Sequence, residues 1–395
     1  MKVVIVHNSN QQHAGDDVVV AHETKLLEAA GNHVVLFKRS NWDVESYKGL
    51  GKLELAVRTV WSIDTKRDFA RLLREEKPDI VHVHNTFVMV SPSIYSACSE
   101  AGIPVVQTLH NFRLFCPSAT LFRDGKVCEE CMQHSLLRSV QYGCYRNSRA
   151  ATSVTALMLS FHRLRATWNR EISCFVALSE FARGIFIEGG LPAKKIAVKP
   201  NFVDPDPGNR NGDGEYALFI GRLSPEKRVS MLLAAWQRLK ISIPVLIVGS
   251  GPEEASLRAQ AEQLGLTNVQ FTGQLPREKT IATLNNARFL VFPSEWYECF
   301  PMTLAESFAC STPVICSRMG TMHEVVSDGR TGLHYTPGNV AELAERAEWA
   351  WTHPREVREM GKEARKDYEA KYTAEKNYPM LMEIYKRAME GQCQV

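Results

Sequence analysis

The loop around position 222 combines an arginine and a lysine at the end of a predicted strand. Arg222 and Lys227 stand five residues apart in the string GRLSPEK, directly after the apolar run 216–220. Arginine offers a planar fork and lysine a compact point charge, so the two together can grip a diphosphate. The alternative is an ordinary solvated pair of loop charges. The pair alone does not choose between a diphosphate site and a solvated pair, so neighbouring motifs must decide between them.

A second string, ECFPMTLAE, begins at Glu298 and ends at Glu306. Pro301 suits the first position of a helix, because it has no amide hydrogen to leave unsatisfied. The free amides of Met302 and Thr303 would then face an anion, with the positive end of the helix behind them. Both glutamates could reach one site, one at a sugar and the other at a ribose. The alternative is a surface helix with two incidental glutamates.

Four cysteines cluster in one Gly/Arg-rich segment that is poor in apolar residues. Cys116, Cys128, Cys131 and Cys144 follow one another at intervals of eleven, two and twelve residues. One Cys-x-x-Cys flanked by a further cysteine on each side can bind a structural zinc ion tetrahedrally. The alternative is four unlinked thiols in a long loop, since a second Cys-x-x-Cys is missing.

Two histidines alternate on the predicted strand 80–84. His82 and His84 share one face of that strand, so a metal pair is geometrically possible. No third ligand follows at a usual spacing, and this favours satisfied histidines at a strand end. We therefore leave both out of the predicted site.

The segment from residue 132 to residue 170 carries six arginines and no acidic residue. Its second half, 150–170, places four apolar residues at helical spacing and three arginines at its end: Leu157, Phe161, Leu164 and Trp168, then Arg163, Arg165 and Arg170. A basic amphipathic helix can lie on an anionic lipid surface. A core helix with arginine ends fits the same periodicity, and the pattern does not choose between them.

These residues must be positioned by elements that the whole chain repeats. Short apolar runs predict strands at 3–7, 33–37, 80–84, 104–109, 174–178 and 195–198, and again at 216–220, 245–248, 269–271, 289–292, 313–316 and 332–335. Helical patterns fill the intervals. Alternation of strand and helix predicts parallel sheets covered by helices on both faces, and two such series predict two doubly wound domains. Ligands of such domains bind at the carboxyl ends of the strands.

The predicted division between the domains lies in 200–215, which has three prolines, three glycines and almost no apolar content. This composition is typical of a linker. We predict a first domain at 1–200 with a cysteine-bearing insertion at 112–148, a linker at 201–215, a second domain at 216–371, and a C-terminal helix and tail at 372–395.

Composition limits the class of protein further. At 395 residues the chain is too long for one ordinary core, and 45% hydrophobic content argues against disorder. The net charge of +3 is small, and we expect no nucleic-acid partner. The chain opens on an apolar run with no leader pattern, and the charge-free stretch 150–161 is shorter than the ~20 residues that a membrane span needs. We expect a cytoplasmic protein whose ten cysteines are mostly reduced.

The string Gly-Arg-Leu-x-x-x-Lys, followed by two glutamates with seven residues between them, resembles the retaining family 4 glycosyltransferases of group 1, which have the GT-B fold. The similarity covers nearly the whole chain. It includes, in family order, the Gly15 loop, Thr108-Leu109-His110, Ala177-Leu178-Ser179-Glu180, Pro200-Asn201-Phe202-Val203-Asp204 and Val248-Gly249-Ser250-Gly251-Pro252. The resemblance implies two Rossmann-like domains facing each other across a donor cleft, with the C-terminal helix returning to the first domain.

The resemblance also implies roles for individual residues. Arg222 and Lys227 match the diphosphate-binding pair, Glu298 the ligand of the donor sugar hydroxyls, and Glu306 the ribose ligand. His110 resembles the histidine beside the sugar carbon, and with Glu298 it is the predicted catalytic residue. Further donor contacts are expected at Gly15, at Gly249 and Leu275 near the nucleobase, and at Phe300, Met302 and Thr303.

The function implied is transfer of a hexose with retention, from a nucleotide sugar (a UDP-sugar is favoured) to a glycan or lipid-linked saccharide in cell-surface polysaccharide synthesis. The leaving phosphate is expected to take the acceptor proton, so catalysis consists of positioning and electrostatic stabilisation. No catalytic metal or other cofactor is expected, apart from the structural zinc. The protein could act at the inner face of the membrane. Two alternatives remain: a nucleotide-sugar 2-epimerase of the same fold, and a cysteine-cluster binding module with a vestigial donor site.

Overall fold

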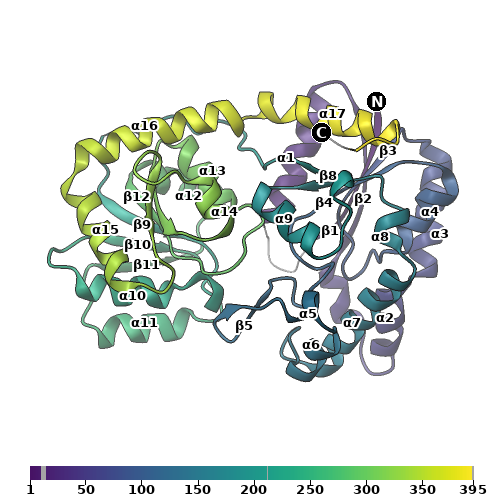
Figure 1. Ribbon diagram of the computed structural model, residues 1–395, viewed down its shortest axis with the longest axis horizontal. Helices are drawn as coiled ribbons and strands as arrows, with labels where there is room; N and C mark the ends of the chain where they lie inside the picture. Colours follow the sequence, from purple (N-terminus) through teal and green to yellow (C-terminus); the bar gives the residue numbers. More distant parts are fainter. Residues whose placement is uncertain (10–14, 211, 394–395) are drawn as a thin grey trace. The chain divides into compact units, whose positions relative to one another are not determined.

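The computed structural model describes residues 1–9, 15–210 and 212–393. The chain separates into two compact units, coloured by sequence in Figure 1. The first unit contains Met1–Leu121, Cys128–Pro200 and Asn377–Val395, and the second contains Phe122–Val127 and Asn201–Lys376.

The first unit is built on a parallel sheet of six strands in the order β2-β1-β3-β4-β7-β8. Its strands are β1 (Lys2–Ser9), β2 (His33–Ser40), β3 (Ile80–Asn85), β4 (Val105–Thr108), β7 (Cys174–Ala177) and β8 (Ile196–Val198). The run Val3–Val6 in β1 is fully buried, as a strand covered on both faces requires.

Helices of the first unit follow the strands. They are α1 (Gly15–Ala29), α2 (Gly51–Val60), α3 (Ile63–Glu76), α4 (Ser93–Ala101), α5 (Glu130–Gln133), α6 (Leu137–Tyr142), α7 (Arg149–Leu164), α8 (Thr167–Arg170) and α9 (Glu180–Glu188). Gly31 ends α1 at a φ of +80°, and the amide of Asn32 donates to the carbonyl of Leu27. Glycine adopts this left-handed conformation at little cost, so the helix stops where the sequence predicts.

The second unit has its own parallel sheet, in the order β11-β10-β9-β12-β13-β14. The strands are β9 (Tyr216–Ile220), β10 (Val245–Val248), β11 (Val269–Gly273), β12 (Ala287–Phe292), β13 (Val314–Ser317) and β14 (Gly332–Tyr335). All twelve strands expected from the apolar runs are present in the two sheets, with ends shifted by at most three residues.

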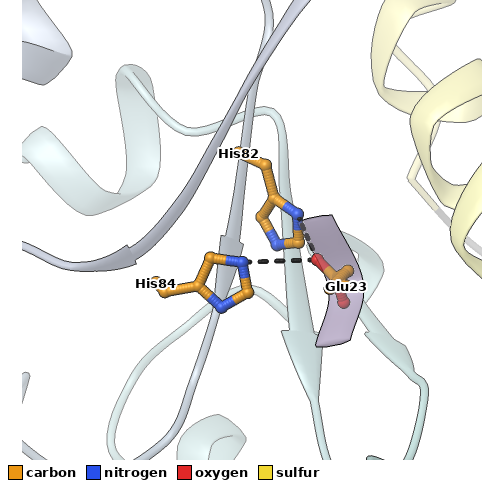
Figure 2. A group of neighbouring side chains, drawn as sticks. All are labelled: Glu23, His82 and His84. Carbon is orange, nitrogen blue, oxygen red and sulfur yellow. Dashed lines mark ion pairs between the residues drawn. The ribbon is translucent and has the colours of Figure 1, made fainter. Parts of the chain in front are cut away.

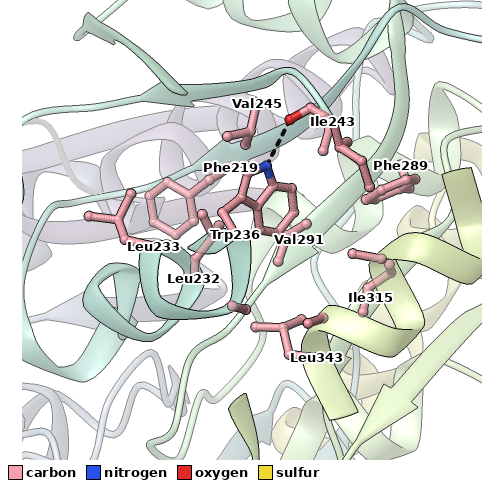
Figure 3. Close-up of a cluster of buried hydrophobic side chains, with 14 of the residues drawn as sticks. Phe219, Leu232, Leu233, Trp236, Ile243, Val245, Phe289, Val291, Ile315 and Leu343 are labelled. Atoms are coloured by element: carbon pink, nitrogen blue, oxygen red, sulfur yellow. Dashed lines mark hydrogen bonds between the residues drawn. The ribbon is translucent and has the colours of Figure 1, made fainter. Parts of the chain in front are cut away.

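The second sheet lies between two layers of helices. Figure 1 shows α10 (Val229–Arg238), α11 (Glu254–Gln263) and α15 (Val340–Thr352) on one side, and α12 (Arg277–Asn285), α13 (Met302–Ala309) and α14 (Gly320–Val325) on the other. Trp236 of α10 lies in the apolar core between its helix and the strands (Figure 3). Its indole nitrogen donates a hydrogen bond of 2.9 Å to the carbonyl of Ile243, so this large side chain is buried without an unsatisfied polar atom.

The last two helices belong to different units. Helix α16 (Pro354–Lys371) lies in the second unit, whereas α17 (Ala374–Met389) lies mostly in the first. Leu381, Ile384 and Tyr385 of α17 are buried in the same core as Val3 and Ile5 of β1. The prediction that the C-terminal helix returns to the first domain is confirmed.

The first residues of the predicted linker are packed into the second unit. Asn201, Phe202 and Val203 are buried, and the amide of Val203 donates to the carbonyl of Tyr372, so the Pro-rich stretch begins as a packed part of the second unit. A disulfide joins Cys174 to Cys393, whereas the other eight cysteines, all among the described residues, form no disulfide, in agreement with the expectation of mostly reduced thiols. These two thiols are 219 residues apart and meet through the docking of the C-terminal segment, which their spacing does not reveal.

None of the helices in the described parts of the chain is both long enough and apolar enough to cross a membrane.

Candidate functional site

The strand order of the second unit places a ligand site between β9 and β12. The chain runs outward from β9 through β10 to β11 and then returns to the other side of β9 with β12. Doubly wound sheets bind ligands at such a switch point, outside the carboxyl ends of the strands. The segment after β9 is Gly221–Lys227 and the segment after β12 contains Glu298, so the fold brings the two predicted motifs to the same edge.

The loops after β9 and β10 are packed backbone against backbone. The amide of Leu223 donates to the carbonyl of Ser250 at 2.9 Å, and the amide of Gly221 donates to the carbonyl of Val248 at 3.0 Å. A side chain at Gly249 would place its Cβ 1.9 Å from the Gly221 carbonyl oxygen. Only glycine allows this approach. Gly249 therefore shapes the predicted diphosphate loop as well as the predicted nucleobase segment.

Lys227 and Glu298 meet directly. The Lys227 ammonium donates to Glu298 Oε1, and the indole nitrogen of Trp296 donates to the same oxygen at 2.6 Å. The ammonium also lies 5.5 Å from the centre of the Trp296 ring, within cation–π range. Both charged side chains are largely buried. The predicted diphosphate ligand and the predicted sugar ligand thus form one ion pair in this state, and Trp296 is a member that the motif did not reveal.

Glu306 lies in α13, whose first turn holds the predicted anion site. Helix α13 starts at Met302, one residue later than predicted. Pro301 is the residue immediately before the helix, with φ −75° and ψ 115°. Thr303 is in the first turn, where backbone amides have no partner within the helix. Glu306 Oε1 accepts a hydrogen bond of 2.7 Å from Arg277 of α12. The pattern alone did not predict this arginine, because its segment lies before β12.

The remaining predicted donor residues differ in their surroundings. Arg222 is exposed on the loop after β9, and Leu275 is half-buried just before α12. The Phe300 ring is buried against Tyr372, with 5.4 Å between the ring centres, so a contact with a donor would come from its backbone. Gly15 is exposed and begins α1 of the first unit.

Arg228 is a further cation beside this loop. It follows Lys227 and lies 2.8 Å from Glu295, the residue that also accepts a hydrogen bond from the amide of Gly338. Its guanidinium donates to the carbonyl of Gly125, in the turn between β5 (Phe122–Arg123) and β6 (Lys126–Val127). This hairpin belongs in sequence to the predicted cysteine-bearing insertion but in space to the second unit.

His110 follows β4 in the first unit and is in contact with a second histidine. Its Nε2 lies 2.9 Å from Nδ1 of His84. It lines a small cavity of about 40 Å³ together with His84 and Arg113. Burial and the neighbouring His84 hold the pKa of His110 well below its usual value, so the ring is neutral at physiological pH.

His82 and His84, which we left out of the predicted site, meet a third side chain in the structure. Glu23 of α1 meets both, with its Oε1 at 2.9 Å from His82 Nδ1 and 3.3 Å from His84 Nε2 (Figure 2). All three side chains are buried, and their ligand atoms are close enough to hold a metal ion. The partner comes from a helix 59 residues earlier, which no local spacing rule finds.

The four clustered cysteines lie near one another in the first unit. Burial, with smaller effects from Cys116, Cys144 and Cys128, raises the pKa of Cys131 to about 11. Within the described residues, however, no three of these sulfur atoms fall within 4.8 Å of one another. Zn–S bonds of about 2.3 Å would bring tetrahedral ligands closer than that.

The basic amphipathic segment is not one helix. Helix α7 ends at Leu164, and Ala166 adopts a left-handed conformation with φ +54° before the short α8. The predicted apolar stripe is therefore divided: Leu157 and Leu164 are 60% and 89% exposed, whereas Trp168 is buried against Tyr95. The segment therefore has a core face as well as exposed leucines, and contact with a lipid surface stays a prediction.

The arginines of this segment are partly engaged within the protein. Arg163 donates to the carbonyl of Leu114 at 3.4 Å. Arg165 lies over the Trp61 ring at 4.8 Å and pairs with Glu171 at 3.3 Å. Their positive charge is therefore only partly available to a partner.

Comparisons with known families agree with this arrangement. The family model described as glycosyl transferases group 1 matches residues 202–367, and the model described as glycosyltransferase family 4 matches residues 15–207. The chain belongs to the family 4 glycosyltransferases. The two matches together include the Gly221–Lys227 loop, both predicted glutamates and His110.

Individual relatives of this glycosyltransferase share part of its length. The D-rhamnosyltransferase WbpZ of Pseudomonas aeruginosa is 37% identical over 161 residues, which are 40% of this chain and 42% of the relative. The O-antigen chain mannosyltransferase C of Escherichia coli is 31% identical over 178 residues, 45% of this chain and 47% of the relative. The matches thus span less than half of the length of these curated relatives.

A solved structure covers the whole fold. Anabaena Alr3699/HepE in complex with UDP superimposes with a TM-score of 0.70 at 17% identity, covering 98% of this chain and 100% of that one. At this identity the likeness shows the fold, which is GT-B.

Proposed function

We propose that this protein transfers a hexose from a UDP-sugar to a saccharide acceptor, with retention of configuration. The observation that carries the proposal is the arrangement at the β9/β12 switch point. There Lys227, Arg222 and the first turn of α13 offer positive charge, beside two glutamates that are buried and already hydrogen-bonded. Such a set suits an anionic diphosphate flanked by hydroxyl-rich groups.

Each residue would have a separate task. Lys227 and Arg222 would bind the diphosphate and stabilise the charge that develops on it as the nucleotide leaves. Glu298 would exchange its contact with Lys227 for hydroxyl groups of the sugar. Glu306, oriented by Arg277, would accept from the ribose. The choice of uracil is supported by the UDP bound in the HepE structure.

In the transfer step, the acceptor oxygen bonds to the anomeric carbon as the bond from that carbon to the phosphate oxygen breaks. The leaving phosphate takes the acceptor proton on the same face of the sugar, so the products are the glycoside and UDP. Catalysis then consists of positioning and electrostatic stabilisation. Because the helix terminus and the two cations supply positive charge, we propose that no divalent metal takes part and that excess EDTA leaves transfer intact.

A lipid-linked acceptor, approached at an anionic membrane surface, is part of the proposal. It is supported by a surface cavity of about 530 Å³ on the first unit, lined by apolar residues of α6 and α7 that include the exposed Leu137, Leu157 and Leu164. The acid-free segment 132–170 surrounds it. Exposed apolar groups beside basic residues favour a membrane interface.

Nucleotide binding tests the donor site. Thermal unfolding is followed with UDP, GDP and ADP, and UDP is expected to give the largest stabilisation, about 2.7 kcal/mol at 100 times its Kd. The Lys227→Met variant should fold and lose most of this effect, whereas Arg258→Met, in an exposed ion pair on α11, should keep it. A larger effect of GDP would overturn the choice of a UDP-sugar, and no effect of any nucleotide would overturn the donor site. Conversion of the donor without acceptor to its 2-epimer would show an epimerase instead.

A further inference from the structure

A row of polar side chains runs from the buried core of the first unit to His110. The Lys199 ammonium lies 3.1 Å from Glu23 Oε2, and Glu23 Oε1 lies 3.3 Å from His84 Nε2. His84 Nδ1 in turn lies 2.9 Å from His110 Nε2. The first three side chains are at most 3% exposed, whereas His110 is only half-buried. The row thus links a buried ion pair to a partly exposed histidine that lines the cavity of about 40 Å³.

The charges along this row are defined by their surroundings. Burial alone would raise the pKa of Glu23, but Lys199 and His82 hold it well below its usual value. Burial and the neighbouring His82 lower the pKa of His84 to about 3. At neutral pH Glu23 is therefore a carboxylate, and His84 and His110 are neutral rings with one N–H each.

The positions of these two protons follow from the negative charge beside His84 and from the hydrogen bond between His84 and His110. The Glu23 carboxylate has no proton to donate and repels a nitrogen lone pair, so His84 Nε2, which lies 3.3 Å from Glu23 Oε1, carries the proton. His84 Nδ1 is then an acceptor. The His110 nitrogen in contact with it, Nε2, must be the donor, and His110 Nδ1 has no proton. The hydrogen bond made by one ring nitrogen decides the role of the other.

We propose that Glu23 and His84 are positioning residues that fix His110 as the Nε2–H tautomer, leaving its Nδ1 as an acceptor for a hydroxyl group of the substrate. The inference rests on the proposed function of His110 in sugar transfer. It adds two residues, from α1 and β3, to which no motif assigned a task. A wrong tautomer would present an N–H to the hydroxyl and lose this contact.

A metal ion at the three residues drawn in Figure 2 is disfavoured by two neighbouring side chains, Lys199 and Tyr385. Glu23, His82 and His84 have the chemistry of ligands. The Lys199 ammonium, however, already neutralises the carboxylate, and the Tyr385 hydroxyl lies 2.7 Å from His82 Nδ1. A divalent cation would leave uncompensated positive charge in a fully buried site, which is costly.

The C-terminal helix completes the row. Asn377 of α17 accepts a hydrogen bond of 2.9 Å from Lys199 and donates one of 2.7 Å to the carbonyl of Pro200. Lys199 is thereby held against Glu23. The return of α17 to the first unit therefore supports the charge that orients His84.

The test replaces the ion pair without leaving one charge buried alone. In Glu23→Leu/Lys199→Met, no acceptor faces His84 Nε2, so His84 is expected to move its proton to Nδ1 and His110 to become the Nδ1–H tautomer. The matched control, Glu23→Gln/Lys199→Met, removes the same two charges but keeps a carbonyl oxygen for His84 and should retain the original tautomer. Long-range ¹H–¹⁵N correlation spectra of the imidazole nitrogens distinguish the Nδ1–H tautomer from the Nε2–H tautomer. The His110 signals are assigned as those that are missing from the spectrum of the His110→Asn variant.

Turnover of UDP-glucose gives the second readout. The leucine variant should lose about 10²-fold in kcat, as expected for a misplaced polar group, while the glutamine control should keep most of the wild-type rate. Packing or electrostatics alone would affect both variants equally. An Nδ1–H or doubly protonated His110 in the wild-type protein at pH 7 would overturn the inference even if the variants failed to fold. Absence of wild-type turnover would instead count against the proposed function, since the NMR measurement needs no substrate.

Discussion

The close packing of the loops after β9 and β10 makes Gly251→Ala a sharp test of the donor site. Its backbone is not in the left-handed region, so alanine is conformationally acceptable. Its Cβ, however, would lie 2.3 Å from the Leu223 carbonyl oxygen, whereas Cβ atoms essentially never come within 3.0 Å of such a neighbour. The two loops must therefore separate by about 0.7 Å.

Donor binding should be affected because the backbone of Leu223 makes hydrogen bonds with both its amide and its carbonyl group. Its amide donates to Ser250, and its carbonyl accepts from the amide of Glu253 at 3.0 Å. Displacing Leu223 moves the whole Gly221–Lys227 loop and misplaces both cations. A shift approaching 1 Å can lower the rate by about 10²-fold, which corresponds to about 2.7 kcal/mol in kcat/KM. The steric strain should also lower the free energy of unfolding by about 1–3 kcal/mol.

Gly265→Ala is the matched control. Gly265 follows α11 in the same unit, has a φ of +65° and has no atom within 4 Å of an added Cβ. Alanine there should cost about 1–2 kcal/mol of stability through its left-handed backbone, without moving the donor loop. The assays are thermal unfolding, UDP titration and turnover of UDP-glucose. If Gly251→Ala binds UDP and turns over like Gly265→Ala, the reasoning that links loop packing to the donor site is refuted.

Three further outcomes are expected. Arg222→Ala or Lys227→Ala should lower transfer by about 10²-fold or more while the fold is kept, and wild-type kinetics in both would remove the diphosphate assignment. Elemental analysis of protein purified without added metal should find about one zinc per chain, and Cys128→Ser/Cys131→Ser should abolish this zinc. Because the pKa of Cys131 is about 11 without metal, zinc binding should release protons. Freely titrating thiols at these cysteines would contradict the zinc site. Leu157→Ser/Leu164→Ser should weaken co-sedimentation with anionic vesicles by about 10-fold or more, whereas Ile241→Ser on the second unit should have no effect. Arg163→Gln/Arg165→Gln/Arg170→Gln should reduce the part of vesicle binding that depends on salt concentration. A wild-type protein that does not bind such vesicles at low salt would favour a soluble acceptor.

The strands of both sheets and the positions of the predicted donor motifs could be read from the amino-acid sequence alone. Parallel strands buried on both faces must be apolar along their length, so runs such as Val3–Val6 and Tyr216–Ile220 are visible without any structure. Because ligands bind at the carboxyl ends of such strands, the residues just after them, Arg222 and Glu298, could also be recognised. Local spacing carried this information.

Contacts between side chains of different elements became visible only in the folded structure. Arg277 reaches Glu306 from the preceding helix, Trp296 joins the pair of Lys227 and Glu298, and Glu23 reaches His84 from α1. A break at Ala166 separated exposed Leu164 from buried Trp168, although their spacing suits one helix. Periodicity is a property of neighbours along the chain. Hydrogen bonds and ion pairs between elements depend on how helices dock on the sheet, which is why they appear only in the folded protein.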